Sequence, residues 1–555
     1  SRGYACPKGV SFHEVTHDPD RILHPMKREG GQWTRVTWDQ AVREIAEKLN
    51  RIRLRHGPHA IALYRGNPSA FSYNHALFLT GFGEAIGTRN VYGAGSADSL
   101  ADFAASKFLY GASFLQPIPD VERTRYAIFI GVNPAISHAT LVNIQDTKTR
   151  LKAIRKRGGK VVVIDPRRTE TAEIADEHVF IRPNTDAYLL LAMIRTIFEE
   201  KLEATEFLKA HAREAEVLRG AAQPFTPELA AEKTGIPAET IRRITREYRE
   251  AEGAFLYGRV TCGRFGTLAA WCLEAVNVVA GKLDAPGGML FGEGITDIAA
   301  IADLSGIGDY GRYRSRIGGH PDVLGELPAG VLVEEIKTPG EGQIRAMVTS
   351  AGNPVLSIAQ GEELAEALDE LECLVAVDFY MSETAAKAHY ILPCTTFFER
   401  ADFPLAHANL MSQPYAQWTE AVIPPQGEAK EEWEIYTLLS EAMGLPILGS
   451  KVADGLRKAL GAVGAKFSPR TLMDAMIRLG PYGDKYLPWR KGLTLEKLKE
   501  HPHGKLLRPL RAGIAGEKLR TKDKKIALWN EAIAGEVARL AAEGDLTPDA
   551  AYPFR

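Results

Sequence analysis

The sequence predicts an α/β protein with two parallel β-sheets, and three observations support this prediction. Short, continuous apolar runs alternate with amphipathic segments of helical period, which is typical of strands buried on both faces of a parallel sheet. One strand–loop–helix–strand segment occurs twice along the chain. The length of 555 residues, with 45% hydrophobic and 25% charged residues, fits a globular protein of several domains.

The predicted elements begin with a helix over 40–55, whose apolar residues recur at helical spacing. One long amphipathic helix is predicted over 226–252, and a mostly apolar helix over 267–281. The stretch 291–340 is rich in glycine and irregular, so it makes the best mid-chain boundary. The further predicted strands are 61–64, 126–130, 160–164, 344–350 and 374–377, and the further predicted helices are 144–156, 430–443 and 525–542.

Charge and cysteine content exclude several classes of protein. The 68 Lys and Arg balance 70 Asp and Glu, which gives a net charge of −2. The chain therefore lacks the excess of positive charge that is typical of nucleic-acid-binding proteins. The five cysteines are at least ten residues apart, which excludes a zinc ribbon or a local iron–sulfur loop. The longest apolar runs, such as 188–194, are far shorter than the roughly 20 residues that span a bilayer. We therefore expect a soluble protein without a membrane span, in a bacterial-type cytoplasm or periplasm.

The repeated segment is the most informative feature of the sequence. From each of two aspartates, Asp165 and Asp378, a glutamate follows five residues on, a threonine six, and alanines seven and ten residues on. A strand that ends in Gly, Asn and Pro precedes each copy, at 131–134 and at 352–354. Each copy therefore reads as strand, Gly/Asn/Pro loop, helix, strand and aspartate.

Such segments have a known physical use. Ligands bind beyond the carboxyl ends of parallel strands, where glycine lets backbone N–H groups approach a pyrophosphate. An aspartate at the tip of the next strand can accept hydrogen bonds from a ribose or a guanine edge. Two copies predict two nucleotide-like ligands, or one ligand with two similar halves; a duplication in which one half or neither binds a ligand is the alternative. The match to G-x-G-x-x-G at 306–311 neither follows a convincing strand nor opens a helix, so it does not indicate a dinucleotide dehydrogenase.

Four further motifs accompany the repeat between residue 6 and about residue 410: Cys6-Pro7-Lys8-Gly9, Trp38-Asp39-Gln40-Ala41, Arg182-Pro183-Asn184-Thr185-Asp186 and Gly281-Lys282-Leu283-Asp284-Ala285-Pro286-Gly287-Gly288. Together with the repeat, they resemble the molybdopterin oxidoreductases of the dimethyl sulfoxide reductase superfamily. These proteins carry molybdenum or tungsten on two pterin guanine dinucleotides. The resemblance implies two related Rossmann-like parallel-sheet domains that face a shared cofactor crevice, with irregular N- and C-terminal segments.

The resemblance implies a catalytic subunit or core that performs two-electron oxo-transfer at a bis(molybdopterin guanine dinucleotide) metal centre. Its partners would be a small-molecule oxo-acceptor or donor and an iron–sulfur electron-transfer subunit. The alternative is a non-catalytic electron-transfer scaffold, related to the molybdenum-free subunit of respiratory NADH dehydrogenase.

The resemblance also implies a metal ligand. In this family a Cys, selenocysteine, Ser or Asp side chain reaches the metal from a loop that opens a helix. The spacing from Asn90 and back from Gly111 assigns this position to Asp98. A carboxylate is a hard ligand suited to a high-valent metal, and the positive end of a helix favours it. An N-cap role is the alternative for Asp98, and Ser96 and Ser99 are the alternative ligands.

The other implied site residues lie mainly in the two repeated segments. Lys8 occupies the position of the family's lysine between cluster and pterin, with a solvated surface lysine as the alternative. Arg167 follows a strand and could bind a phosphate, or form a surface ion pair. The expected cofactor-binding residues are Gly131, Asn133, Pro134, Asp165, Arg167, Thr169, Asp186, Gly258, Gly352, Asn353, Pro354, Asp378, Glu383 and Thr384.

The sequence departs from the family pattern at both ends. Many members carry three more cysteines before the equivalent of Cys6, and the four bind a [4Fe-4S] cluster, which we expect in a full-length form but not in this chain. The family's C-terminal dinucleotide-binding domain is not visible either, so the resemblance suggests a fragment. The predicted division is a remnant of the iron–sulfur segment at 1–40, a discontinuous α/β dinucleotide-binding domain at 41–95 plus 335–440, a second such domain at 96–334, and a helical and irregular segment at 441–555.

Overall fold

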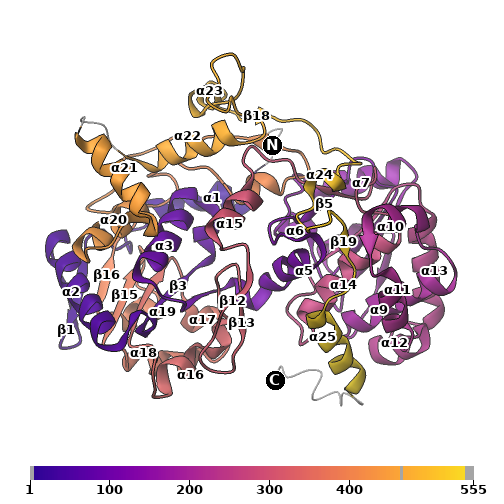
Figure 1. Cartoon of the computed structure of the whole chain (residues 1–555), viewed down its shortest axis with the longest axis horizontal. Coiled ribbons are helices and arrows are strands. Elements are labelled where there is room, and N and C mark those ends of the chain that lie inside the picture. Colours follow the sequence, from indigo (N-terminus) through magenta and orange to yellow (C-terminus); the bar gives the residue numbers. More distant parts are fainter. Residues whose placement is uncertain (1–4, 463–466, 544–555) are drawn as a thin grey trace.

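Two halves, each built around a parallel sheet, lie side by side in the computed structural model, which describes residues 5–462 and 467–543 (Figure 1). A seven-stranded sheet has the order β2-β1-β16-β15-β14-β3-β4, and a four-stranded sheet has the order β10-β6-β7-β8. The larger sheet lies in the left half of Figure 1, and helices that cover the smaller sheet lie in the right half. The protein is therefore a mixed α/β protein with parallel sheets.

The larger sheet combines strands from distant parts of the chain. Its parallel strands are β3 (Ile61–Arg65), β4 (Val91–Gly93), β14 (Ala346–Ser350), β15 (Cys373–Val377) and β16 (Tyr390–Leu392). Ala346 pairs with both Ile61 and Cys373, and every residue of β14 and β15 is buried. The hairpin of β1 (Met26–Glu29) and β2 (Gln32–Arg35) adds an antiparallel edge, so residues 26–35 belong to this sheet rather than to a separate N-terminal segment.

Helices cover both faces of the larger sheet, which explains the continuous apolar runs of its central strands. Helices α2 (Trp38–His56), α3 (Tyr73–Ile86) and α20 (Glu432–Ala442) pack with Leu63, Val348 and Val375 on one face. Helices α16 (Leu332–Lys337) and α18 (Gly361–Asp369) pack with Met347 and Leu374 on the other.

The smaller sheet consists entirely of parallel strands. They are β6 (Tyr126–Ile130), β7 (Lys160–Ile164), β8 (Glu177–Val179) and β10 (Ala254–Gly258), and Ile128 pairs with Val162 and Leu256. Helices α9 (Asp186–Glu199) and α14 (Gly266–Val279) share the largest hydrophobic core with these strands. The bounds of β6 and β7 confirm the predicted strands.

The remaining elements connect or flank the sheets. The other helices are α1 (Pro7–Thr16), α4 (Gly95–Asp98), α5 (Leu100–Tyr110), α6 (Pro134–Ser137), α7 (Thr147–Lys156), α8 (Glu170–Ile174), α10 (Thr205–His211), α11 (Ala215–Ala222), α12 (Pro227–Thr234), α13 (Ala238–Glu250), α15 (Ile298–Ser305), α17 (Pro354–Ser357), α19 (Glu383–Lys387), α21 (Lys451–Ala462), α22 (Pro469–Leu479), α23 (Leu495–Lys499), α24 (Ala515–Lys518) and α25 (Glu531–Ala542). The 3-10 helices are η1 (Pro58–Ala60), η2 (Asn67–Phe71), η3 (Ala329–Val331), η4 (His407–Asn409) and η5 (Ile447–Gly449). The other strands are β5 (Pro117–Pro119), β9 (Ala212–Arg213), β11 (Met289–Phe291), β12 (Tyr310–Arg314), β13 (Pro321–Val323), β17 (Tyr415–Ala416), β18 (Lys505–Leu506) and β19 (Ile526–Ala527).

Two predicted helices are wrong in extent, and a third stretch holds more structure than expected. The segment 226–252 forms two helices, α12 and α13, because Gly235 takes a left-handed φ of 78° and Pro237 lacks an N–H group. The last helix begins only at Glu531, because Ile526 and Ala527 pair with β9 and Asn530 caps the helix. The glycine-rich stretch 291–340 contains α15, α16 and the hairpin of β12 and β13.

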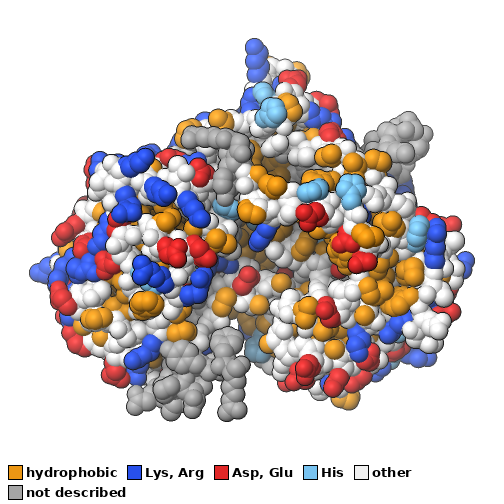
Figure 2. Space-filling model, turned by 180° about the vertical axis from the view of Figure 1, so that it is seen from behind, with side chains coloured by type: hydrophobic (Ala, Val, Ile, Leu, Met, Phe, Trp, Pro, Cys, Tyr) orange, Lys and Arg blue, Asp and Glu red, His pale blue; other side chains and the backbone are white. Residues whose placement is uncertain are grey.

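The surface agrees with the balanced composition. Seen from behind, Lys and Arg side chains alternate with Asp and Glu side chains over both halves (Figure 2). Within the described residues, no helix combines the length and the apolar character needed to cross a bilayer.

Candidate functional site

The loop after β6 is fixed by one asparagine side chain. The carboxamide oxygen of Asn133 accepts hydrogen bonds from the backbone N–H (3.1 Å) and the hydroxyl (2.7 Å) of Thr171. Its nitrogen donates to the carboxylate of Glu170 at 2.7 Å. The Thr171 hydroxyl oxygen in turn accepts the backbone N–H of Ala135 at 3.0 Å. These bonds join the loop that follows β6 to the first turn of α8.

The loop after β14 repeats this arrangement atom for atom. The carboxamide oxygen of Asn353 accepts from the backbone N–H (3.1 Å) and the hydroxyl (2.8 Å) of Thr384, and its nitrogen donates to Glu383 at 2.5 Å. The Thr384 hydroxyl oxygen accepts the backbone N–H of Val355 at 3.2 Å. The internal repeat of the sequence is therefore also a repeat of local structure at the carboxyl edges of both sheets.

These bonds give several predicted cofactor-binding side chains a clear structural role. Asn133 bonds to Glu170 and Thr171, and Asn353 bonds to Glu383 and Thr384, so these side chains fix the shapes of the two loops. Thr169 is the N-cap of α8, where its hydroxyl accepts the backbone N–H of Ala172 at 3.1 Å. Glu170 and Thr171, which were not predicted as site residues, complete the first loop; the repeat offsets carried the signal for both.

The glycines at the strand ends have no room for a side chain. A Cβ on Gly258 would lie 2.5 Å from the carbonyl oxygen of Ile130, and a Cβ on Gly66 would lie 1.6 Å from that of Ala351. Gly131 also has a left-handed φ of 59°. In each sheet, neighbouring chain segments therefore meet backbone to backbone at the carboxyl edge, an approach that only glycine allows.

Three predicted aspartates lie half-buried or buried beside these loops. Burial raises the pKa of Asp165, and it raises the pKa of Asp186 and of Asp378 to about 6. The charge of Asp165 contributes to the raised pKa of Asp186, so these two carboxyl groups lie in one neighbourhood. Arg167 donates its backbone N–H to Asp165 at 2.8 Å, while its exposed side chain forms an ion pair of 3.3 Å with Glu170.

Asp98 lies at the junction of α4 and α5, and its backbone is held by the half that contains the smaller sheet. Its carbonyl oxygen accepts hydrogen bonds from the guanidinium of Arg259 at 2.7 Å and from the hydroxyl of Thr261. The same guanidinium forms an ion pair with Asp102, one turn further along α5. The Asp98 carboxylate is exposed, and no side-chain cap bond is found at the start of α5. The N-cap alternative for Asp98 is therefore wrong.

The other side of α4 is held by Glu326, which is only 4% exposed. Its carboxylate accepts the backbone N–H of Ser96 at 3.1 Å and pairs with Arg65 at 2.8 Å, at the end of β3. A Cβ on Gly93 would lie 2.7 Å from this carboxylate. The carboxylate therefore occupies the space beside Gly93 that any larger residue would fill. The loop with Asp98 is therefore fixed by residues of both halves.

The two alternative metal ligands are engaged in hydrogen bonds. The Ser96 hydroxyl donates to the carbonyl oxygen of Gly93 at 3.0 Å and accepts the backbone N–H of Ala329 at 3.0 Å. The Ser99 hydroxyl donates to the carbonyl oxygen of Gly95 at 3.3 Å. Of the three candidates, Asp98 has the side chain that extends from the loop.

Loops from the carboxyl edges of both sheets contact one segment of chain, 407–412. Phe71, at the end of η2 after β3, stacks on His407 with ring centroids 4.5 Å apart. Asn143, after α6, exchanges backbone hydrogen bonds with Leu410 (2.8 Å) and Ser412 (3.0 Å). Both edges therefore adjoin the same region of the molecule.

Lys8 lies on the exposed side of α1, and its positive charge affects the pKa of a histidine after β6. Burial lowers the pKa of His138, at the end of α6, and the positive charge of Lys8 lowers it further. Lys8 is thus exposed, as the alternative interpretation expected, and also close to one of the two repeated loops.

Sequence reasoning missed the residues that hold the Asp98 loop. Arg259 and Thr261 directly follow β10, a position that gave a weak signal because strand ends carry ligand-facing residues. Glu326 is separated from Ser96 by 230 residues and lies in the glycine-rich stretch, where the sequence offers no signal for this contact.

Comparison with known proteins identifies the family of this chain. The family model of the molybdopterin oxidoreductases matches residues 21–442, so the chain belongs to the molybdopterin oxidoreductase family. This result confirms the resemblance predicted from the motifs, and the family implies a molybdenum–pterin cofactor.

Two curated relatives and one solved structure illustrate the relationship. The chain is 29% identical over 464 residues to the thiosulfate reductase molybdopterin-containing subunit PhsA of Salmonella typhimurium, covering 79% of this chain and 59% of the relative. It is 26% identical over 476 residues to formate dehydrogenase H of Escherichia coli, covering 80% and 64%. The structure of acetylene hydratase from Pelobacter acetylenicus has the same fold, with a TM-score of 0.76 at 22% identity over 99% of this chain and 75% of that one. The chain spans about three fifths of the length of these curated relatives.

Proposed function

We propose that this chain is the catalytic core of a molybdopterin-dependent oxidoreductase, with one pterin guanine dinucleotide bound at the carboxyl edge of each sheet. In this proposal the two halves are Rossmann-like domains that face a shared cofactor crevice. The observation that supports it most strongly is the identical Asn–Glu–Thr arrangement at both edges. A duplicated loop structure suits a cofactor with two chemically identical halves.

The residues present fit such a cofactor. Glycines such as Gly258 and Gly352 let chain segments pack closely at the strand ends, and the backbone N–H groups of the loops that follow would bind a pyrophosphate there. The half-buried carboxyl groups of Asp186 and Asp378, with pKa values raised to about 6, are suited to accept hydrogen bonds from purine N–H groups, which stabilise the ionised form. Arg167 is exposed and could turn from Glu170 to a phosphate.

Asp98 would be the single protein ligand of the metal. Its exposed carboxylate extends from a loop fixed by Arg259 and Glu326, so its position is pre-organised. When bound, the cofactor supplies two-electron redox chemistry and a metal at which an oxygen atom is exchanged with a small-molecule oxo-donor or acceptor. The chain supplies the ligand, the orientation and the local charge, with Lys8 near one pterin.

Electrons would pass through an iron–sulfur partner subunit and, in a full-length form, through a [4Fe-4S] cluster in the N-terminal segment. The names of the relatives, a thiosulfate reductase subunit and a formate dehydrogenase, favour an enzyme over a non-catalytic scaffold. The relationship to thiosulfate reductase makes sulfur oxyanions the first class of substrate to test.

Metal and nucleotide analysis tests this function. The protein is purified from cells grown with molybdate or with tungstate, and acid hydrolysis then releases the nucleotide part of the cofactor. We expect about one metal atom and about two guanine nucleotides per chain. Protein with neither metal nor guanine nucleotide would support the scaffold and contradict the enzyme.

A further inference from the structure

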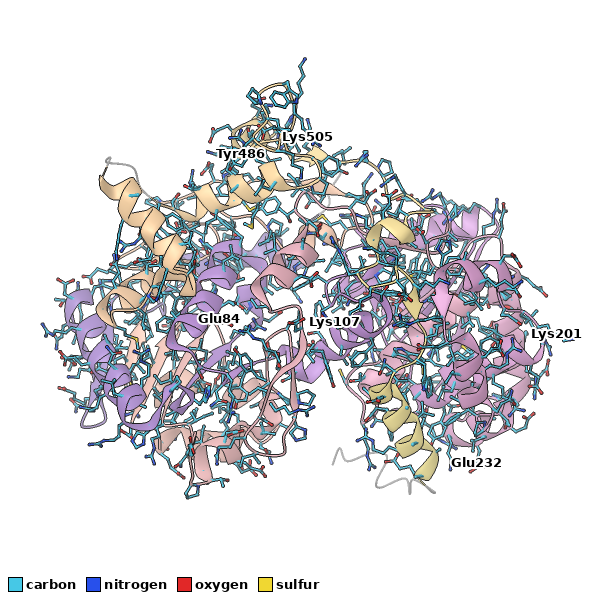
Figure 3. The ribbon with its side chains drawn as sticks, viewed as in Figure 1. Glu84, Lys107, Lys201, Glu232, Tyr486 and Lys505 are labelled. Atoms are coloured by element: carbon cyan, nitrogen blue, oxygen red, sulfur yellow. The ribbon has the colours of Figure 1, made fainter. Side chains whose placement is uncertain are left out.

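A basic lobe, residues 478–511, projects from the top of the molecule, where Figure 3 labels Tyr486 and Lys505. Inside the lobe, Leu493, Leu495 and Leu498 are buried in one cluster with two residues of α22, Met473 and Ile477. The same cluster contains Tyr73 and Phe403, so the lobe is attached through a hydrophobic core that it shares with the body of the molecule.

The tip of the lobe exposes an apolar and basic sequence. The six consecutive residues 486–491, Tyr-Leu-Pro-Trp-Arg-Lys, are all exposed, and the Trp489 side chain is 79% exposed. Leu479 and Leu506 elsewhere in the lobe are 59% and 69% exposed. Exposed apolar side chains gathered in one projecting segment indicate an interaction surface.

The base of this tip is closed and strained, so its shape is set before any partner binds. The carboxylate of Asp484 binds the Arg478 guanidinium through two hydrogen bonds of 2.9 Å and also accepts the Tyr486 backbone N–H at 2.9 Å. Lys485 and Tyr486 both have a left-handed φ of 58°, which is unfavourable for residues other than glycine. Strained backbone held by such contacts is typical of functional loops.

The charge of the lobe identifies the kind of partner. Residues 478–511 contain nine Lys or Arg and three Asp or Glu, and Figure 2 shows Lys, Arg and His side chains at the top of the molecule. Among the described residues, no carboxylate pairs with Arg490 or Lys491, the two cations beside Trp489. The partner surface is therefore anionic.

Two features favour a lipid surface over a protein. Tryptophan, tyrosine and arginine are frequent at protein–protein interfaces as well, but lysine is depleted there, whereas lysine next to aromatic residues is typical of segments that lie at a lipid interface. The tip is also convex, and a convex tip can touch a plane without a complementary pocket.

We propose that the basic lobe docks the protein on the surface of an anionic lipid bilayer. Trp489 and Leu487 enter the headgroup region, while Arg490 and Lys491 contact lipid phosphates. This inference does not depend on the proposed enzymatic function, because the lobe lies outside the candidate site.

Vesicle sedimentation tests the proposal. The protein is mixed with vesicles of phosphatidylcholine alone, or with about one third phosphatidylglycerol, at low and at high salt. We expect binding to the anionic vesicles at low salt and little binding to the neutral ones. The double variant Arg490→Ser/Lys491→Ser should bind about 30-fold more weakly, because each cation near an anionic surface strengthens binding about five-fold. Trp489→Ser should also bind more weakly.

Helix α2 offers matched controls far from the lobe, at the left edge of Figure 1. It exposes Leu54, which is 82% exposed, between Arg51 and Arg55. Leu54→Ser and the double variant Arg51→Ser/Arg55→Ser should bind like the unaltered protein. All these side chains are on the surface, so thermal unfolding of each variant should match that of the unaltered protein.

A second measurement reports the depth of the tip. Brominated lipids should quench the tryptophan emission of the unaltered protein, and Trp489→Phe should remove this quenching while binding is retained. Equal binding to neutral and anionic vesicles, or equal binding by the lobe variants and the α2 controls, would overturn the proposal. So would a dimer that Trp489→Ser converts to a monomer, because the lobe would then be an interface between copies of the chain.

Discussion

Replacing Asn133 by alanine removes three hydrogen bonds that fix the loop after β6. Thr171 is fully buried, so its backbone N–H would lose its acceptor without access to water. An unsatisfied buried donor and a lost hydroxyl bond together cost about 2–4 kcal/mol. The loop should therefore open locally, and amide hydrogen exchange in 170–175 should become roughly 30- to 700-fold faster.

Hydrogen exchange followed by mass spectrometry measures this change peptide by peptide. Asn353→Ala should produce the same acceleration in 383–388, in the other half, and leave 170–175 unchanged. Asn50→Ala, which removes a single bond of 3.2 Å to Met443, is the control and should affect neither segment. Unchanged exchange at Thr171, or exchange accelerated across the whole smaller sheet, would refute the reasoning that these asparagines fix the loops locally.

Three further predictions concern the Asp98 loop and its surroundings. Asp98→Ala should abolish turnover and leave the guanine nucleotide content largely unchanged, and unaltered turnover would remove Asp98 from the metal site. Glu326→Ala removes the carboxylate that pairs with the partly exposed Arg65, so thermal or urea unfolding should reveal a loss of stability of about 1.5–3 kcal/mol, whereas a loss below about 1 kcal/mol would contradict the assigned role. Burial raises the pKa of Glu274, which accepts a hydrogen bond from Tyr110, to about 8, so this group stabilises the fold at low pH and the stabilisation is lost as pH rises through 8. Between about pH 4.5 and pH 8 the unaltered protein should lose stability relative to Glu274→Gln by at most about 1.4 kcal/mol per pH unit, so that the variant is the more stable above pH 8; parallel profiles between pH 4.5 and 8 would contradict the assignment.

The parts of the fold that local patterns determine could be predicted from the sequence. The strands β6 and β7 consist of five consecutive buried or nearly buried residues between turn signals, so their bounds were predictable. The Gly/Asn/Pro loops that precede the two copies identified Asn133 and Asn353 as equivalent positions, and their hydrogen bonds are equivalent. A duplicated pattern is informative because two copies must satisfy the same local geometry.

The parts that depend on distant contacts could not be predicted. Ile526 and Ala527 are apolar residues that continue a helical pattern, but pairing with β9 makes them a strand. Glu326 holds the Asp98 loop through Ser96 and Arg65, which come from two other parts of the chain. Such contacts follow from the tertiary arrangement, and no spacing within the sequence reports them. The break at Gly235 was visible in the sequence, because glycine followed by proline usually ends a helix.

Anomalous X-ray diffraction at the molybdenum or tungsten absorption edge tests the central claim most directly. It locates the metal in crystals of the purified protein without any assumption about the cofactor. We predict one peak per chain, within coordination distance of the Asp98 carboxylate and between the loops that contain Asn133 and Asn353. A peak away from the Asp98 carboxylate and from both loops would contradict the account.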